Sequence, residues 1–349
     1  MAESEPLAET ARETRARPEA TVLRPAARTL PQPFAQVRAE LDRVNRELQE
    51  DVRPDAPELV PLIEQVARYR GKQLRPALVL LSARACGAVR DEHIVVAKVV
   101  ELIHTATLVH DDVLDGGVLR RQVPTVNALY GNEVPVLLGD YLYARAFHMA
   151  VQMSDQTCSR VLSETTRVVC QGEITQILHR FDWNLSEERY TEIVRDKTAS
   201  LYAAACRLGG HYAGATPALV EALDHFGTRM GIAFQIVDDC LDLRGTEAVV
   251  GKSLGTDLDK GKMTLPLLHL LRSGAEVADR LRRMLSETAA EARLDRLRRD
   301  FDLDRAIAYA LGRAEHHVAC ARRALQDFPA GPARDALATV AGYVLERQW

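Results

Sequence analysis

The chain has 349 residues, of which 47% are hydrophobic, 27% are charged and 5% are aromatic, and its formal net charge is −4. This balance excludes a wholly disordered chain and is sufficient for a large buried core. A slightly acidic chain has no general attraction to nucleic acid or anionic lipid, so we expect neither nucleic-acid binding nor stable membrane insertion.

Cysteine usage and the apolar segments indicate a cellular compartment. The six cysteines lie far apart with no C-x-x-C pair, which predicts neither a zinc site nor a disulfide framework and is typical of a reducing environment. The most apolar segment, residues 94–109, contains Lys98, Glu101 and His104, which argues against a membrane span. The first residues show no apolar signal sequence. We therefore expect a cytoplasmic protein.

Residues 1–33 predict a flexible N-terminal arm, because prolines recur in a mixture of Ala, Arg and Glu that has no sustained apolar stripe. From Phe34 onward the apolar residues follow the helical period, and strand-type alternation is rare. The abundance of Ala, Leu, Arg and Glu favours the same structure. The sequence therefore predicts one all-α domain over residues 34–349.

The helix predicted over residues 99–115 has two faces of different character. Its apolar face should pack against neighbouring helices and consists of Val99, Leu102, Ile103, Ala106, Val109 and Val113. The other face carries His104, Asp111 and Asp115, with Asp112 beside them. Asp111 and Asp115 are four residues apart, so their carboxylates leave the helix one above the other. Three negative charges at the end of an apolar helix must be solvated or neutralised.

The same D-D-x-x-D pattern recurs at residues 238–242, again late in an apolar helix. Gln235, Asp238 and Asp242 share one face of that helix, and Asp239 adjoins them. A single copy of the pattern is most simply a solvated helix end. Two copies in apolar helices favour a site for Mg²⁺, which is held by carboxylates together with substrate phosphates.

Basic residues occur near both acidic clusters. They are Lys72, Arg75, Arg120, Arg121, Lys197, Lys252 and Lys262. Any one of them alone is explained by a surface ion pair. In the company of metal-binding carboxylates they predict a diphosphate site, because Arg and Lys donate to phosphate oxygens. Lys252 and Lys262 lie on a glycine-rich stretch, residues 245–266, which we expect to close over a bound diphosphate.

Eight motifs occur in the chain in a characteristic order. They are G-K-Q-L-R-P (71–76), H-T-A-T-L-V-H-D-D-V-L-D (104–115), R-R (120–121), L-L-G-D-Y (137–141), G-E-I-T-Q (172–176), K-T (197–198), F-Q-I-V-D-D-C-L-D (234–242) and G-K-S-L-G-T-D-L-D-K-G-K (251–262). With them the chain resembles the all-E (trans-type) isoprenyl diphosphate synthases, or polyprenyl synthetases, over about residues 35–349. The resemblance implies a single-domain helical bundle of the isoprenoid synthase type around a deep central cavity, assembled as a homodimer.

The resemblance also implies roles for individual residues. Isopentenyl diphosphate would be bound by Lys72, Arg75, His104 and Arg121, although a lone helical histidine such as His104 is more often structural. The allylic diphosphate would be held by Arg120, Lys197, Thr198, Gln235, Lys252 and Lys262. Mg²⁺, three ions per active site, would be bound by Asp111, Asp112, Asp115, Asp238, Asp239 and Asp242. Catalysis would depend above all on Asp111, Asp115, Arg120, Lys197, Asp238 and Lys262.

The implied reaction is a head-to-tail (1′-4) condensation of isopentenyl diphosphate with an allylic diphosphate. Departure of the allylic diphosphate leaves a carbocation, the double bond of isopentenyl diphosphate attacks it, and loss of a proton restores an alkene. Cationic groups around the departing diphosphate stabilise the transition state electrostatically. No nucleophilic side chain is required.

Product length should depend on the cavity beyond the first acidic cluster. Short-chain members of the family tend to carry a bulky aromatic plug just before that cluster. Here Ala106 and Thr107 are small, which predicts an all-trans product longer than geranylgeranyl diphosphate. The floor of the cavity is then expected lower down, near Phe147 or Leu162.

Other functions remain open at this point. A shorter-chain synthase, making farnesyl or geranylgeranyl diphosphate, would carry the same motifs. A non-catalytic subunit of a heteromeric synthase usually loses one acidic cluster, and both are intact here. A class I terpene cyclase would not need Lys72, Arg75 and Arg121. A purely structural helical scaffold would leave the paired aspartate clusters unexplained.

Overall fold

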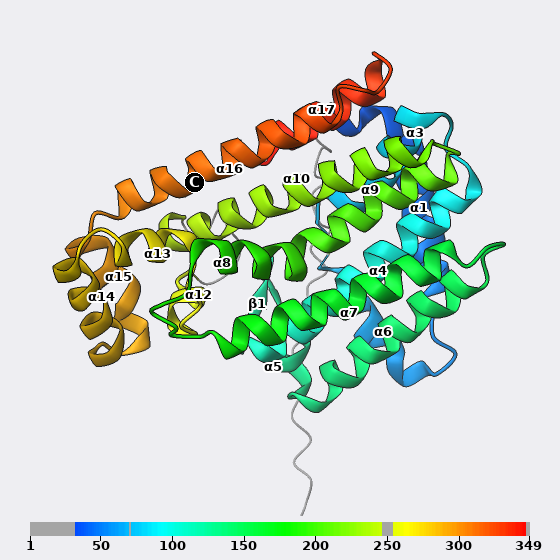
Figure 1. The fold of residues 1–349 in the computed structure, drawn as a ribbon. Helices are drawn as coiled ribbons and strands as arrows, with labels where there is room; N and C mark the ends of the chain where they lie inside the picture. The colour runs from blue at the N-terminus through cyan, green and yellow to red at the C-terminus, as the bar shows by residue number, and fades with distance from the viewer. Residues whose placement is uncertain (1–31, 70, 246–253, 347–349) are drawn as a thin grey trace, which may run out of the picture.

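The computed structural model describes residues 32–69, 71–245 and 254–346, and it confirms the all-α fold. Long helices lie along one another in layers (Figure 1). The only strands in the described part of the chain are β1 (Leu119–Arg120) and β2 (Val123–Pro124), which pair as a short antiparallel hairpin. The predicted arm, residues 1–33, lies almost entirely outside the described residues, so the boundary at Phe34 stays a prediction.

The helices follow one another along the chain with short connections. The α-helices are α1 (Arg38–Asp51), α2 (Val60–Ala67), α3 (Leu74–Cys86), α4 (Asp91–Leu114), α5 (Val126–Tyr130), α6 (Glu133–Val151), α7 (Thr157–Leu178), α8 (Glu187–Val194), α9 (Ser200–Tyr212), α10 (Pro217–Arg244), α12 (Thr256–Asp259), α13 (Leu265–Leu271), α14 (Ala275–Glu287), α15 (Ala290–Asp300), α16 (Leu303–Ala324) and α17 (Pro332–Tyr343). Two short 3₁₀ turns, η1 (Gln32–Val37) and η2 (Pro57–Leu59), and one π-helical turn, η3 (Arg195–Ala199), complete the list.

Four of these helices begin at a residue whose side chain caps them. The capping residues are Thr125 before α5, Ser186 before α8, Thr216 before α10 and Asp302 before α16. In each case the side-chain oxygen accepts a hydrogen bond from the backbone N–H three residues later. That N–H has no partner inside the helix, so the cap stabilises the first turn.

The helix that carries the first acidic cluster, α4, lies in the core. It packs against α3, α6 and α9. Most of the predicted apolar face is confirmed, since Val99, Ile103 and Ala106 are fully buried and Leu102 and Val109 nearly so. Val113, near the end of the helix, is only partly buried. Among the described residues α4 alone is long and apolar enough to cross a membrane, but 67% of its apolar window is buried inside the protein. A core helix of a folded domain has the same character.

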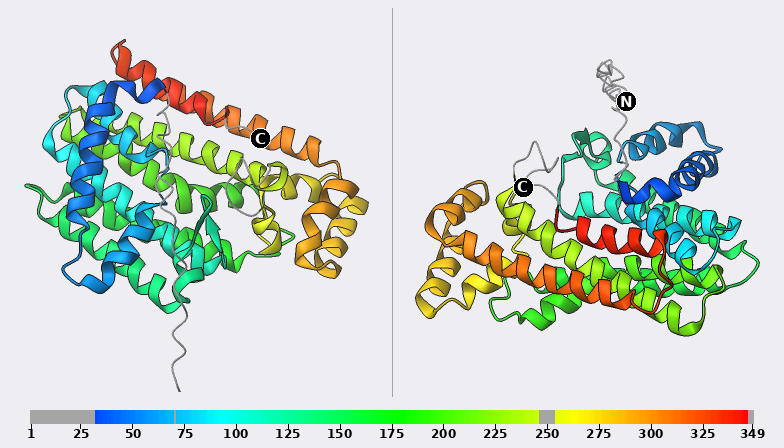
Figure 2. Two further views of the ribbon diagram at one scale, coloured as in Figure 1. Left: turned by 180° about the vertical axis from the view of Figure 1, so that it is seen from behind. Right: turned by 90° about the horizontal axis from the view of Figure 1, so that it is seen from above.

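The two ends of the molecule differ in structure. The short helices α13, α14 and α15 form one end, and α1 and α3 lie toward the other (Figures 1 and 2). Part of the stretch predicted to be irregular, residues 245–266, folds as the four-residue helix α12 and the start of α13. Lys252, which we predicted to hold diphosphate, lies outside the described residues.

Candidate active site

A cavity of about 1760 Å³ lies among α3, α4, α6, α7, α10 and η3. Sites for small molecules usually measure roughly 300–1,000 Å³. This cavity is therefore large enough for two ligands or for one long ligand. Both charged and apolar residues line it, the apolar ones including Leu108, Leu142, Val169, Ile174, Ile177 and Phe234.

The first acidic cluster enters the cavity from the C-terminal end of α4. Asp111, Asp112 and Asp115 all line the cavity. Asp112 is 4% exposed and accepts two hydrogen bonds from Nε of Arg120, at 2.9 and 3.0 Å, and one from Nη2 at 2.7 Å. Burial raises the pKa of Asp112 although Arg120 opposes this shift. Burial also raises the pKa of Asp111, and the neighbouring Glu173 and Asp115 add to the effect. Burial therefore makes these carboxylates costly to ionise, and a bound cation would offset that cost by favouring their charged form.

The second cluster contributes one aspartate to the cavity lining. Asp238 of α10 lines the same cavity as Asp111, so two helices far apart in sequence present carboxylates to one space. Asp239 instead accepts hydrogen bonds from Tyr190 at 2.6 Å and Gln235 at 2.8 Å, and burial raises its pKa to about 7. Asp242 is fully buried and accepts from the Thr256 hydroxyl at 3.4 Å and the Asp257 N–H at 3.2 Å. Neither Asp239 nor Asp242 lines the cavity.

Two lysines on different elements meet the carboxylates. Lys197, on η3, forms an ion pair with Glu173 and donates to Gln176 at 2.9 Å. Lys262 lies 3.1 Å from Asp115 and 3.0 Å from Asp257. Burial by itself lowers the pKa of a lysine, but the surrounding carboxylates outweigh it and raise the pKa of both. Both lysines are therefore ammonium ions, and both line the cavity beside these carboxylates.

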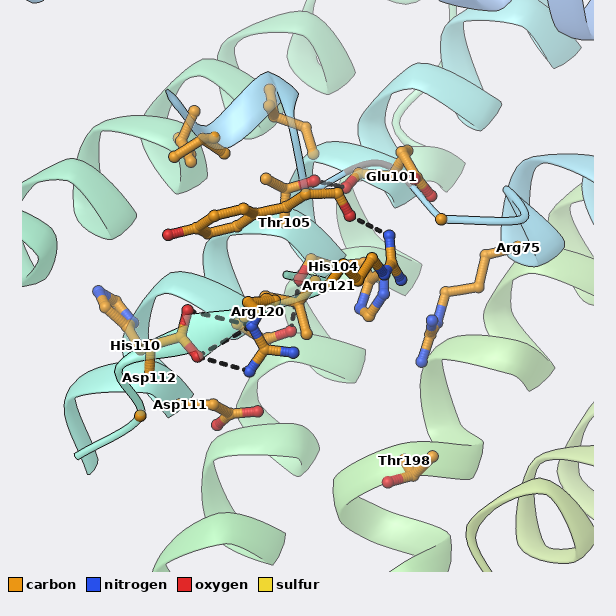
Figure 3. A pocket seen from close by; sticks show the side chains of 18 of the residues that line it. Arg75, Glu101, His104, Thr105, His110, Asp111, Asp112, Arg120, Arg121 and Thr198 are labelled. Carbon is orange, nitrogen blue, oxygen red and sulfur yellow. Dashed lines mark hydrogen bonds and ion pairs between the residues drawn. The ribbon is translucent and has the colours of Figure 1, made fainter. Parts of the chain in front are cut away.

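The four residues predicted to bind isopentenyl diphosphate all line the cavity. Figure 3 shows three of them, Arg75, His104 and Arg121. Lys72 donates to the hydroxyl of Tyr343 and lies over its ring, and Arg75 lies 4.3 Å from the ring centre of Tyr202. Arg121 donates to the carbonyl of Tyr69. Burial, followed by the nearby arginines, lowers the pKa of His104 well below its usual range. His104 is therefore neutral near pH 7, and the positive charge of these four residues comes from Lys72, Arg75 and Arg121.

The remaining predicted residues divide between the cavity and the core. Thr198 donates to Gln235 at 2.9 Å, and both line the cavity, as does Thr107. Ala106 and Leu162 are fully buried, and Phe147 packs against the core, all three outside the cavity lining. A floor at Phe147 or Leu162 stays a prediction.

Among the lining residues that reasoning from the sequence did not single out are Tyr143, Glu173, Asp257 and Cys170. Glu173 belongs to the G-E-I-T-Q motif and Asp257 to the motif at 251–262, so a signal for these two was present. Tyr143 and Cys170 lie in no motif, and only the packing of α6 and α7 brings them to the cavity.

The oxygen donors fit Mg²⁺. Asp111, Asp115 and Asp238 present carboxylates to a single cavity. In the part of the chain that the structure describes, no group of three or more His, Cys, Asp or Glu side chains is arranged to hold a metal by itself. Mg²⁺ is usually bound by one or two carboxylates together with water and substrate phosphates, so carboxylates such as those of Asp111, Asp115 and Asp238 are donors of the kind it takes.

Comparisons with known proteins agree with this geometry. The family model for polyprenyl synthetase matches residues 56–300. The chain belongs to the polyprenyl synthetase family. It is 37% identical to an octaprenyl diphosphate synthase of Escherichia coli over 293 residues, which are 82% of this chain and 91% of the relative. It is 35% identical to component 2 of a heptaprenyl diphosphate synthase of Bacillus subtilis, covering 89% of this chain and 88% of the relative.

Solved structures show the same fold. The polyprenyl synthase of Caulobacter crescentus, crystallised with calcium and isoprenyl diphosphate, superposes with a TM-score of 0.86 at 36% identity, covering 91% of this chain and 98% of that one. A decaprenyl diphosphate synthase of Rhodobacter capsulatus has a TM-score of 0.79 at 34% identity, with coverage of 90% and 98%. As a polyprenyl synthetase, the chain is a trans-prenyltransferase that makes a polyprenyl diphosphate.

Proposed function

We propose that this polyprenyl synthetase condenses isopentenyl diphosphate with an allylic diphosphate and extends the product beyond geranylgeranyl diphosphate. The observation that carries the proposal is one large cavity lined by carboxylates, by cationic side chains and by apolar residues. The relatives include octaprenyl and decaprenyl diphosphate synthases, which supports a product of medium to long chain.

Different side chains bind the two diphosphates. Arg120, Lys197 and Lys262 donate to the allylic diphosphate and stabilise the charge that develops as it leaves. Mg²⁺, when bound by Asp111, Asp115 and Asp238, supplies further positive charge to the departing diphosphate. We propose three ions per active site. Lys72, Arg75 and Arg121 hold isopentenyl diphosphate so that its double bond faces the allylic carbon.

The apolar lining residues receive the growing chain. Leu142, Val169 and Phe234 exclude water from the carbocation, and Gln235 and Thr198 present polar atoms beside it. The proton lost in the last step passes to the released diphosphate.

One experiment tests activity and product length together. The purified chain is incubated with isopentenyl diphosphate, an allylic primer and Mg²⁺, and the products are sized by chromatography. We expect products longer than geranylgeranyl diphosphate and none after chelation of Mg²⁺. Lys262→Ala should lower kcat/KM by about 10²- to 10³-fold, as expected for loss of one stabilising donor. Products no longer than geranylgeranyl diphosphate would contradict the proposed length. No product from the chain alone, with product after addition of a second subunit, would indicate a heteromeric synthase.

We further propose a cytoplasmic homodimer. Leu129 and Tyr130 of α5, together with Val136 and Leu137 of α6, are large apolar residues that are between 43% and 68% exposed. The two helices pack against each other, and we call these four exposed residues together the α5–α6 face. Exposed apolar patches of this kind mark association surfaces. The free cysteines suit a reducing cytoplasm.

A further inference from the structure

The connection between α7 and α8 contains an unusual backbone conformation. Phe181 has a φ angle of +56°, in the left-handed region that bulky residues rarely adopt. Its side chain is 39% exposed, so burial in the core does not account for the strained conformation. Strain of this kind persists where the surrounding structure enforces it, commonly beside functional sites.

Phe181 holds the segment that carries Lys262. Its N–H donates to the carbonyl of Gly261 at 2.8 Å. Its ring lies against Gly261, where an added Cβ atom would force the ring to move, and Gly261 itself has a φ of +71°. Gly261 immediately precedes Lys262, so the ring and the hydrogen bond fix the backbone at the start of that lysine.

A second residue, Arg293, also contacts this ring. The guanidinium of Arg293, on α15, lies 5.9 Å from the centre of the Phe181 ring. It also donates to the carbonyl of Asp259 at 3.0 Å. One arginine therefore ties the ring to α12, three residues before Lys262, and the attraction between the cation and the ring supports this arrangement.

The lysine fixed in this way faces the cavity. Its side chain is 9% exposed, and its ammonium lies between Asp115 of α4 and Asp257 of α12. The connection also carries Arg180, whose guanidinium lies 4.0 Å from the same Asp115. A long lysine side chain holds one position only when its backbone is fixed, because free rotation would spread the ammonium over many places.

We propose that Phe181 is a positioning residue, which, braced by Arg293, sets the ammonium of Lys262 at the place where the allylic diphosphate binds. The inference rests on the proposed role of Lys262. Phe181 touches no substrate, and its effect on the reaction passes entirely through that lysine.

A double-mutant cycle tests this coupling. Phe181→Gly removes the ring while allowing the left-handed backbone, and Phe181→Tyr keeps the ring. We expect Phe181→Gly to lower kcat/KM for the allylic diphosphate about 10- to 100-fold, the range expected when a catalytic group is misplaced. KM for isopentenyl diphosphate should not change in Phe181→Gly. Phe181→Tyr should keep the activity of the unmodified chain. In a Lys262→Ala background, Phe181→Gly should have no further effect.

A second measurement does not depend on turnover: calorimetry gives the affinity of the protein for inorganic diphosphate in the presence of Mg²⁺. This affinity should be lower in Phe181→Gly than in the unmodified chain, but only when Lys262 is present. Phe301→Gly is the control, because Arg280 lies 5.3 Å from the Phe301 ring in a similar pair between α14 and the end of α15. It should leave both measurements unchanged. Equal losses from Phe181→Gly with and without Lys262 would overturn the inference, as would full activity of Phe181→Gly. Full activity of Lys262→Ala would instead overturn the proposed role of the lysine.

Discussion

Two neighbouring residues of α4, Ala106 and Thr107, have different environments although both are small. Thr107 lines the cavity and donates to the carbonyl of His104 at 2.7 Å. Ala106 is fully buried against other helices. The prediction that small side chains at these two positions allow a long product therefore applies to Thr107 alone.

We expect Thr107→Phe to shorten the product, because its ring would occupy the path of the growing chain. Ala106→Phe should instead lower the free energy of unfolding by about 1–3 kcal/mol through overpacking. Chromatography of the products and chemical unfolding distinguish the two effects. Thr107→Val, similar in shape, is the control and should leave product length unchanged. A folded Thr107→Phe enzyme with wild-type products would show that the chain takes another path.

At the scale of single elements, the close approach of α7 and the π-helical turn η3 places Lys197. A Cβ atom at Gly172 of α7 would lie 2.9 Å from the carbonyl carbon of Asp196 and 2.9 Å from Cα of Lys197. Only glycine permits this approach. The extra residue in a π-turn often accompanies a functional site, and here the turn carries Lys197 and Thr198 to the cavity.

Gly172→Ala should therefore push η3 away from α7 and lower activity, because Lys197 loses its place beside Glu173. The matched control is Gly312→Ala on α16, where an added Cβ meets nothing within 4 Å. The free energy of unfolding of that variant should rise by about 0.5–1 kcal/mol, because alanine has a higher helix propensity than glycine. Kinetics and unfolding curves of both variants provide the comparison. Equal activities of the two variants would argue against a special role for the α7–η3 contact.

For the molecule as a whole, stability should depend on pH through a buried histidine. Burial, together with Arg229, His316 and Arg313, lowers the pKa of His317 to about 4, with Glu187 opposing. In the unfolded chain a histidine has a pKa of about 6.5. The unfolded state therefore binds a proton first as the pH falls, and the folded state loses stability between about pH 6.5 and pH 4.

His317→Gln should make the free energy of unfolding fall less steeply over this pH range, because one titrating group is gone while His104, whose pKa burial also lowers, remains. Urea unfolding at several pH values measures it. His211→Gln, at an exposed histidine, controls for the general effect of the substitution. A His317→Gln curve parallel to that of the unmodified chain would show that other groups govern the acid sensitivity.

The α5–α6 face concerns assembly. Leu137 is 68% exposed, and Leu137→Asp would place a charge in the proposed dimer interface, where it would be costly to bury. We expect sedimentation to show a monomer for this variant and a dimer for the unmodified chain. Tyr309→Asp on α16, which lies on the other side of the molecule from α6 (Figure 1), should remain dimeric. A dimeric Leu137→Asp protein would place the interface elsewhere.

Much of the fold was predictable from local sequence. The apolar face of α4 and the spacing of Asp111 and Asp115 follow from the helical period, which depends only on residues three or four apart. The capping residues and the glycine-rich stretch have the same local origin. The motifs then sufficed to predict the family and the basic residues of the site, because each motif lies within a few residues of chain.

Only the tertiary structure decided which side chains share the cavity. Asp111 and Asp238 meet because α4 and α10 both border it, whereas Asp239 and Asp242, in the same motif as Asp238, bind Tyr190 and α12 instead. The position of Lys262 likewise depends on Phe181, far away in sequence. A helical period specifies the direction of a side chain relative to its own helix, but its neighbours depend on how helices distant in sequence pack together.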